Sequence, residues 1–284
     1  MIKRVPFVNL RRVINASALL KPLLFFCLSS CTNLFFFPTK DLAVTPDTLG
    51  LEYNELELRH TNNTKIRGWK LAAQGKPKGT ILFFHGNAQN ISYHIESVYW
   101  LPKAGFNVIL MDYQGYGPSD GSSSVKSAIA DIRLSLLEFQ SETRPLILYG
   151  QSIGASLSVA ALTSLKPETK IDGVILESPF ASYQQIAREK LRSLWLTWPL
   201  QYPLSLLISD EYAPDKFIAN LPKMPLLMIV SKTDQVVLPH HTLDLFKKAH
   251  QPKELWEYES YPHIGIFQND ATQARLVRYL EGIQ

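Results

Sequence analysis

The chain has 284 residues, of which 46% are hydrophobic and 19% are charged. This length and composition suit a folded chain with one large core or two small ones, and they exclude a disordered, collagen-like or low-complexity protein. The formal net charge of +4 depends on five basic residues within residues 1–30, and the remaining 254 residues carry a net charge of −1, which removes the electrostatic argument for nucleic-acid binding.

Residues 1–30 have the pattern of an export signal. A basic segment precedes the apolar run 22–28, and small residues and Cys31 follow. This order is typical of a secretory signal peptide, and the sequence Leu-Ser-Ser-Cys at 28–31 resembles the bacterial lipoprotein cleavage box. The resemblance implies cleavage before Cys31, lipidation of that cysteine and a chain anchored to a membrane of the bacterial cell envelope. Thr32, rather than aspartate after the cysteine, favours the outer membrane in a Gram-negative organism.

Two other interpretations of this segment stay open. The first is an uncleaved signal anchor in the inner membrane, although the apolar stretch 23–37 has only 15 residues and a bilayer span needs about 20. The second is a cytosolic protein with an unusual N-terminus. We expect residues 31–49 to be a linker and residues 50–284 to form the folded domain.

From residue 52 onwards, the sequence alternates between predicted strands and helices. Residues 52–59 alternate polar and apolar side chains and, with residues 66–72, predict an antiparallel hairpin at a sheet edge. Short runs that are apolar on both faces predict buried parallel strands, at residues 80–84, 108–111, 146–149, 174–176, 226–230 and 255–258. Segments of helical length lie between the strands, at residues 91–101, 125–139, 154–165, 242–249 and 272–280. This order predicts an α/β fold with a mostly parallel, doubly wound sheet.

The loop after the strand at 80–84 has the sequence His85-Gly86-Asn87-Ala88. Hydrolysis of an acyl bond needs two backbone N–H donors for the developing oxyanion, and in this arrangement one of them comes from the loop after this strand. We expect that donor to be Asn87, with Gly86 allowing the backbone to approach a substrate. We expect His85 to be a structural histidine of the loop.

The sequence Gly-Gln-Ser-Ile-Gly at 150–154 follows a predicted strand and opens a predicted helix. This is the pattern of a nucleophile elbow, a sharp turn that exposes a serine. Gly150 and Gly154 flank the serine because a side chain at either position would contact the neighbouring strand or helix. We therefore expect Ser152 to be a nucleophile and the N–H of Ile153 to be the second oxyanion donor.

Residues 180–221 are too many for a single crossover between two strands. They include Trp195, Trp198, Tyr202 and Tyr212 together with several prolines. We expect two or three short helices that form a cap over one end of the sheet, with aromatic side chains that shape an apolar acyl pocket. The alternative is an oversized crossover that packs as ordinary core.

A serine nucleophile needs a histidine that takes its proton and an acid that orients the histidine. In this type of fold the chain order is serine, acid, histidine, so both partners must follow Ser152. Asp234 comes just after the predicted strand at 226–230, at the sheet edge where ligands bind in α/β folds. His263 follows the last predicted strand in the same way. His240 stays a rival base, since a helix start close to Asp234 could also reach the centre.

The sequence gives no sign of a metal or cofactor site. The histidines are spread along the chain, and neither His-Glu-x-x-His nor the phosphate-loop pattern Gly-x-x-x-x-Gly-Lys occurs. We expect no metal, no cofactor and no nucleic-acid partner.

The motifs together resemble the α/β-hydrolase superfamily, and within it the small single-domain hydrolases of the BEM46-like or ABHD13-like type. The resemblance covers about residues 50–284, and its motifs occur in the expected order, at residues 85–88, 112–119, 150–154 and 176–180. Gln114 stands where the family would have arginine, and Ile153 stands where leucine is common. Neither departure concerns a residue that transfers a proton.

The predicted site and the resemblance imply a serine hydrolase with an α/β-hydrolase fold that acts on a small-molecule ester or related acyl bond. Ser152, His263 and Asp234 would form its catalytic triad and an acyl-enzyme intermediate would form on the serine. Three other functions stay open: a serine peptidase or amidase on the same machinery, a catalytically silent surface binding module, and a structural lipoprotein that tethers envelope components.

Overall fold

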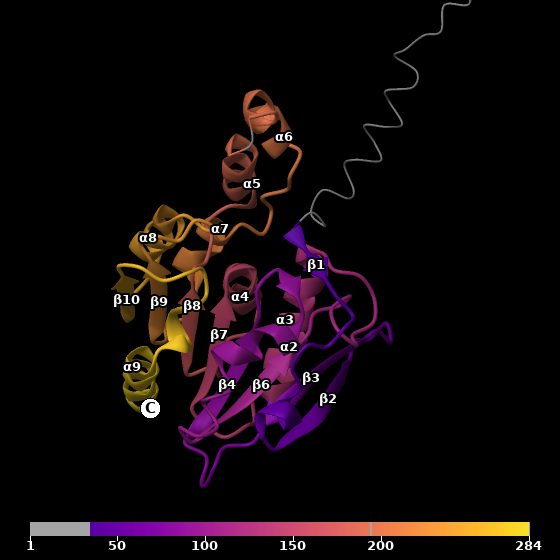
Figure 1. Cartoon of the computed structure of the whole chain (residues 1–284), viewed down its shortest axis with the longest axis vertical. Coiled ribbons are helices and arrows are strands. Elements are labelled where there is room, and N and C mark those ends of the chain that lie inside the picture. The colour runs from indigo at the N-terminus through magenta and orange to yellow at the C-terminus, as the bar shows by residue number, and fades with distance from the viewer. Residues whose placement is uncertain (1–34, 194, 284) are drawn as a thin grey trace, which may run out of the picture.

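The computed structural model describes residues 35–193 and 195–283, and its centre is a sheet with helices on both faces (Figure 1). The strands of this sheet are β2 (Tyr53–Arg59), β3 (Lys65–Leu71), β4 (Gly79–Phe84), β6 (Phe106–Met111), β7 (Leu146–Gln151), β8 (Gly173–Glu177), β9 (Leu226–Ser231) and β10 (Lys253–Tyr258). Their spatial order is β10-β9-β8-β7-β4-β6-β3-β2. The pairs β2–β3 and β3–β6 are antiparallel, and the other pairs are parallel. This confirms the predicted doubly wound, mostly parallel sheet with an antiparallel N-terminal hairpin.

Helices and short 3-10 turns connect the strands. They are η2 (Pro46–Leu49), α2 (Ile91–His94), η3 (Ile95–Ser97), α3 (Val125–Phe139), α4 (Ile153–Thr163), α5 (Tyr183–Arg192), η4 (Trp198–Leu200), α6 (Gln201–Ser205), α7 (Pro214–Phe217), η5 (Ile218–Asn220), α8 (Pro239–Lys248), η6 (Ile266–Gln268) and α9 (Asp270–Glu281). The core lies on both faces of the sheet, because successive side chains of a strand point to opposite sides. Leu82 and Phe84 belong to the cluster with α3 and α4, whereas Ile81 and Phe83 belong to the cluster with α2 and α9.

Two predicted helices show how local sequence sets the element ends. Helix α3 has the predicted bounds, and its first turn is fixed by a capping box in which the Ser124 hydroxyl accepts from the Ser127 N–H at 3.0 Å. The helix predicted over residues 91–101 is shorter in the structure and ends as the 3-10 turn η3. It stops because Val98 leaves the helical region, with φ −135° and ψ −9°.

The segment between β8 and β9 forms short helices, as predicted, and α5 and α6 project from the rest of the molecule (Figure 1). We call residues 183–209 the cap arm. The Asp210 carboxylate closes the arm at its base, because it accepts hydrogen bonds from the Tyr183 N–H at 2.7 Å and the Ser182 hydroxyl at 2.6 Å. A carboxylate at the start of a helix also complements the helix dipole.

The expectation that aromatic residues of the cap shape an acyl pocket is wrong for three of the four aromatic residues that suggested it; the fourth, Tyr212, packs partly buried against the core. Trp195, Trp198 and Tyr202 expose 86%, 56% and 61% of their surface. The reason is their position in the projecting arm: Trp195 and Trp198 lie in the segment that connects α5 to α6, Tyr202 lies on α6, and the two helices pack against one another with these side chains on the outside.

The N-terminal segment is more than a linker. Phe36 is buried, and β1 (Phe37–Pro38) pairs in parallel with β5 (Ala88–Gln89). Further along, the Lys40 ammonium donates to the Ser119 carbonyl at 2.7 Å. The prediction of a linker over residues 31–49 is therefore corrected from Phe35 onwards: this segment packs on the domain because its backbone and apolar side chains find partners there.

The predicted signal peptide at residues 1–30 and the predicted lipidation site at Cys31 lie outside the described residues. Within the described ranges, the helices are too short or too polar to span a bilayer.

Candidate active site

Ser152 occupies a sharp turn between β7 and α4. Its backbone has φ 53° and ψ −117°, a strained conformation for a residue with a side chain. The flanking glycines make the turn possible, since a Cβ atom on Gly150 would lie 2.6 Å from the Cα atom of Ala155, and one on Gly154 would collide with the Phe84 carbonyl. The Ser152 N–H donates to the Glu177 carbonyl at 2.8 Å and so fixes the turn to the neighbouring strand. The turn therefore has the geometry that the Gly-x-Ser-x-Gly pattern predicts.

The structure brings three sequence-predicted residues together at the carboxyl edge of the sheet. The Oγ atom of Ser152 lies 3.0 Å from Nε2 of His263, and Nδ1 of His263 lies 2.7 Å from Oδ2 of Asp234. The three side chains come from segments that follow β7, β10 and β9. The distances allow a proton to pass from the serine to the imidazole while the carboxylate holds the ring.

The loop that carries Asp234 keeps its carboxylate charged and oriented. Oδ1 accepts hydrogen bonds from the Val236 N–H at 2.8 Å and the Val237 N–H at 3.0 Å, and Oδ2 faces His263. Burial opposes ionisation of this acid, but the hydrogen bonds to His263 and to the two backbone groups outweigh burial and hold the pKa of Asp234 below its usual value. The acid is therefore an anion at neutral pH, suited to stabilise a protonated imidazole.

The loop that carries His263 is fixed to the end of β9. The Ser231 hydroxyl donates to the Tyr261 carbonyl at 2.8 Å and accepts from the Tyr261 N–H at 3.0 Å. Ile264 adopts φ 52°, so the chain turns sharply just after the histidine. These constraints hold the imidazole between the serine and the acid.

The predicted oxyanion donors come from two different segments. Ile153 is the first residue of α4, so its N–H has no acceptor within the helix and lies at the positive end of the helix dipole. Asn87 lies in the loop after β4, whose end is paired with β7 next to the serine turn. This arrangement suits the two predicted donors, and their role stays a prediction.

The N-terminal segment supports the Asn87 loop, which the sequence analysis missed. The Asn87 carbonyl accepts hydrogen bonds from the Phe37 N–H at 2.9 Å and the Tyr116 hydroxyl at 2.5 Å. A carbonyl held from two sides fixes the orientation of its peptide plane. A two-residue strand such as β1 gives no periodic signal, so the sequence offered no means to find this contact.

His85, in the loop after β4, and His94, at the end of α2, both support the structure of this loop. His85 is fully buried and packs against the rings of Tyr113, Tyr116 and His94, at centroid distances of 4.6, 5.0 and 5.2 Å. This agrees with the expected structural role of His85. Nε2 of His94 donates a hydrogen bond to the Ala88 carbonyl at 3.0 Å and so fixes the backbone of the loop.

Replacement of His94 with glutamine is expected to make the stability less sensitive to acid. Burial, with a further contribution from His85, lowers the pKa of His94 to about 3, whereas the unfolded chain has an ordinary histidine pKa of about 6.5. Between these values only the unfolded state binds the proton, so the free energy of unfolding falls as the pH falls, by up to about 1.4 kcal/mol per pH unit from this group.

Urea unfolding at about pH 6, 5 and 4 measures this slope. The His94→Gln variant keeps an amide donor for the Ala88 carbonyl but has no proton to bind, so its slope should be lower by about 1 kcal/mol per pH unit. Equal slopes for the two proteins would show that His94 is charged in the native state.

A buried acid, Glu177, lies behind the serine turn. Its carboxylate accepts hydrogen bonds from the Tyr149 hydroxyl and from Nε2 of Gln151, the latter at 2.7 Å. Burial raises the pKa of Glu177, and burial together with the nearby carboxylate raises the pKa of Tyr149 well above its usual value. This network ties the ends of β7 and β8 together beneath Ser152, and it was missed because each member is a single polar residue in an apolar run.

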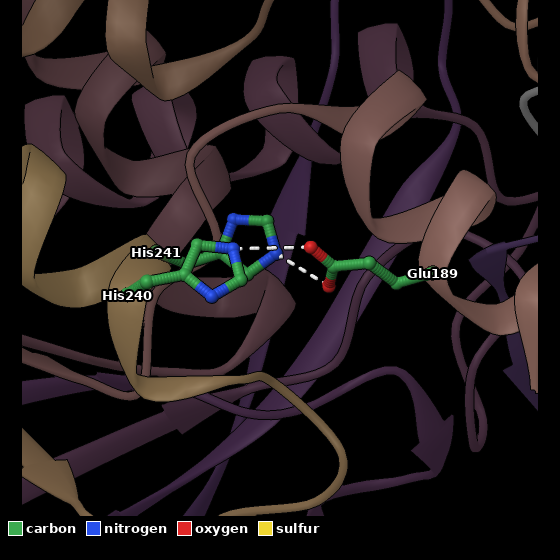
Figure 2. Close-up of side chains that lie close together, drawn as sticks. All are labelled: Glu189, His240 and His241. Atoms are coloured by element: carbon green, nitrogen blue, oxygen red, sulfur yellow. Dashed lines mark hydrogen bonds and ion pairs between the residues drawn. The ribbon is translucent and has the colours of Figure 1, made fainter.

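His240, the rival base, belongs to a different cluster. Its Nε2 atom lies 3.0 Å from Oε1 of Glu189 on the cap arm, and Nε2 of the buried His241 lies 2.9 Å from Oε2 of the same acid (Figure 2). The Ala181 N–H donates to Nδ1 of His241 at 3.2 Å, so the proton of the neutral ring is on Nε2 and points at Glu189. The cluster thus joins α5 to the start of α8, and His263 takes the place beside Ser152.

The same three residues are close enough for a metal ion, since their ligand atoms lie within 4.8 Å of one another. As bonded here, however, Nε2 of His241 carries a proton and offers no lone pair to a cation. Burial lowers the pKa of His241 although Glu189 opposes the effect, which keeps the ring neutral and the hydrogen bond to Glu189 intact. The donor pattern fits a link between two helices better than a metal centre.

Comparison with known proteins agrees with this architecture. The family model described as "Serine aminopeptidase, S33" matches residues 75–220. The protein YfhR of Escherichia coli O157:H7 is 30% identical over 259 residues, which are 87% of this chain and 86% of that protein. The protein bem46 of Schizosaccharomyces pombe is 26% identical over 231 residues, which are 77% of this chain and 72% of that protein.

A solved structure shows the same fold. The esterase Pf2001 of Pyrococcus furiosus superposes with a TM-score of 0.70 at 21% identity, and the match covers 88% of this chain and 98% of that one. The similarity to known proteins extends over most of the chain and agrees with the strand order and the serine turn. This chain therefore belongs to the α/β-hydrolase superfamily and is a BEM46-like hydrolase.

Proposed function

We propose that the protein is a serine esterase that cleaves carboxylic esters through an acyl-enzyme intermediate. The observation that carries the proposal is the chain of two hydrogen bonds, 3.0 Å from Ser152 to His263 and 2.7 Å from His263 to Asp234. Such a chain turns a weakly nucleophilic hydroxyl into an attacking group because the proton has a place to go.

The reaction follows from this geometry. Oγ of Ser152 attacks the ester carbonyl carbon while Nε2 of His263 takes the hydroxyl proton, and the carbonyl oxygen becomes an oxyanion held by the N–H groups of Ile153 and Asn87. The intermediate collapses as the carbon–oxygen bond to the alcohol breaks, and the alcohol leaves with the proton from His263. A water molecule then attacks the acyl-serine by the same steps, which releases the acid and restores the serine.

A serine peptidase or amidase is the second candidate, because the matching family model is described as an aminopeptidase. An aminopeptidase needs an acid to bind the free ammonium group of its substrate. Two acids near the site already have other partners and cannot bind an ammonium group. Glu177 is fully buried and bound to Tyr149 and Gln151, and Asp234 is bound to His263. Several proteins of the same fold are esterases, among them Pf2001, which also supports the choice of esters.

One substrate series separates the candidates. We expect turnover of p-nitrophenyl esters, tested with acyl chains of increasing length, and little turnover of aminoacyl p-nitroanilides. Preference for the anilides would favour the peptidase. Labelling by a fluorophosphonate probe tests the third possibility, since a silent binding module would not react at Ser152.

Replacement of Asp234 with asparagine is expected to lower kcat for p-nitrophenyl ester hydrolysis by about 10⁴-fold. The amide has no charge to stabilise the protonated imidazole, and it can donate to Nδ1 and so favour the wrong tautomer of His263. The measurement is steady-state hydrolysis at neutral pH. Asp244→Asn on α8 is the matched control, because Asp244 is paired with Lys247 on the surface; a similar loss in both variants would contradict the assigned role.

We also propose that Cys31 is lipidated and that the protein is held at a membrane of the bacterial envelope. The basic, apolar and small residues that precede the cysteine support this. Incorporation of a labelled fatty acid into the wild type, and not into Cys31→Ser, is the expected result. Label in both proteins, or in neither, would remove the lipoprotein assignment.

A further inference from the structure

The outer end of the cap arm is an exposed apolar surface. We call residues 195–207 the apex. Among the described residues, seven large hydrophobic side chains expose half or more of their surface, and six of them belong to the apex: Trp195, Leu196, Trp198, Leu200, Tyr202 and Leu206. The seventh is Phe37 in β1. A concentration of this kind marks an interaction surface rather than ordinary scattered exposure.

The apex is uncharged and has a basic rim. No charged residue occurs in the sequence between Arg192 and Asp210. Lys190 and Arg192 are exposed in the last turn of α5, next to the apex. Within the described part of the chain, the Lys190 ammonium donates one exposed hydrogen bond, to the Gln235 carbonyl at 3.3 Å, and pairs with no acid. The acid of that helix, Glu189, is bound by the two histidines of α8. An apolar surface with tryptophan and a positive rim matches a membrane interface with anionic headgroups.

The N-terminus places a membrane within reach of the apex. Phe35 packs edge-on against Tyr183, the first residue of α5, with ring centroids 5.5 Å apart, so the chain enters the domain at the base of the arm. Cys31 is four residues earlier, which allows a span of at most about 14 Å. Helix α5 has ten residues and is about 15 Å long. A membrane that holds the chain near Cys31 can therefore lie level with the apex, whether the anchor is a lipid or an apolar segment.

We propose that the apex docks on a phospholipid bilayer with anionic headgroups. Trp195 and Trp198 enter the interface, and Lys190 and Arg192 contact the headgroups. A second copy of the chain is a poorer partner, because a symmetric contact would bring the two basic rims together. The arm begins just after β8, at the carboxyl edge of the sheet, where the end of β8 binds the serine turn. Docking of the arm therefore brings this edge of the sheet, with the serine, toward the membrane. The proposal does not depend on ester hydrolysis.

Tryptophan fluorescence tests the contact in the full-length protein. The chain is reconstituted into vesicles of phosphatidylglycerol and phosphatidylcholine whose acyl chains carry bromine, which quenches tryptophan on contact. We expect quenching relative to unbrominated vesicles, and we expect the variant with Trp195→Phe and Trp198→Phe to lose it. Of the other three tryptophans, Trp69 and Trp256 are buried and Trp100 packs half-buried against Phe267, so none of them should contribute.

A matched pair of surface substitutions supports the test. Leu196→Glu adds a charge to the apex and should reduce the quenching, whereas Leu137→Glu changes an exposed leucine on α3 and should leave it unchanged. Absence of quenching in the wild type, or equal quenching after both tryptophans are replaced, would overturn the proposal. Sedimentation of a dimer that Leu196→Glu dissociates, without quenching by lipid, would assign the apex to a second copy instead.

Discussion

Replacement of Ser152 with alanine is expected to abolish turnover of p-nitrophenyl esters, with a fall in kcat of about 10⁶-fold. The loss is this large because no other group can form the acyl-enzyme, and the histidine and the acid act only through the serine hydroxyl. Steady-state hydrolysis and fluorophosphonate labelling both measure the effect. The fold should persist, because alanine can take the strained backbone conformation as well as serine does and the N–H bond to Glu177 is kept.

Ser158 provides the matched control for this variant. It is a buried serine on α4, the helix that follows Ser152, and its hydroxyl donates to the Gly154 carbonyl at 2.7 Å instead of facing the histidine. The Ser158→Ala variant should keep activity within a few-fold and should still react with the probe. Unchanged ester turnover in a folded Ser152→Ala protein would place the chemistry elsewhere.

The meeting of Ser152, Asp234 and His263 could be predicted because each residue follows a parallel strand of the sheet. The carboxyl ends of parallel strands lie at one edge of the sheet, so residues that are 111 and 29 positions apart in the sequence come within hydrogen-bond distance. The glycines around the serine added a local signal, since the turn leaves no room for a side chain at either position. The positions of the candidate site residues could thus be predicted mainly from the strand ends and from the glycines of the serine turn.

Contacts between distant surface segments could not be predicted in the same way. The pairing of β1 with β5 involves two residues on each side, which is too short for any periodic pattern. The pairing of Glu189 with His241 joins residues 52 positions apart, and no local motif links them. The tryptophans of the apex suggested a pocket only through their residue type. The sequence does not reveal which side of a segment other elements will cover, so it could not show that these side chains are exposed.

Replacement of His263 with alanine is expected to lower kcat for ester hydrolysis by about 10⁶-fold, as large a loss as removal of the serine. Without the imidazole, the serine proton has no acceptor at 3.0 Å, and the Asp234 carboxylate faces an empty space instead of a partner that it can stabilise. The measurement is p-nitrophenyl ester hydrolysis at neutral pH, with circular dichroism to verify the fold.

His240→Ala is the matched comparison, because both histidines follow Ser152 in the chain and His240 lies at the start of a helix, six residues after Asp234. His240 is partly exposed, and its ring lies beside Glu189 of the cap arm rather than beside the serine. Its loss removes a contact to Glu189 on the cap arm but takes no group from the proton-transfer chain, so activity should stay within a few-fold. If His240→Ala lost activity by orders of magnitude while His263→Ala retained it, His240 would be the base, and the arm would have to move to bring it to the serine.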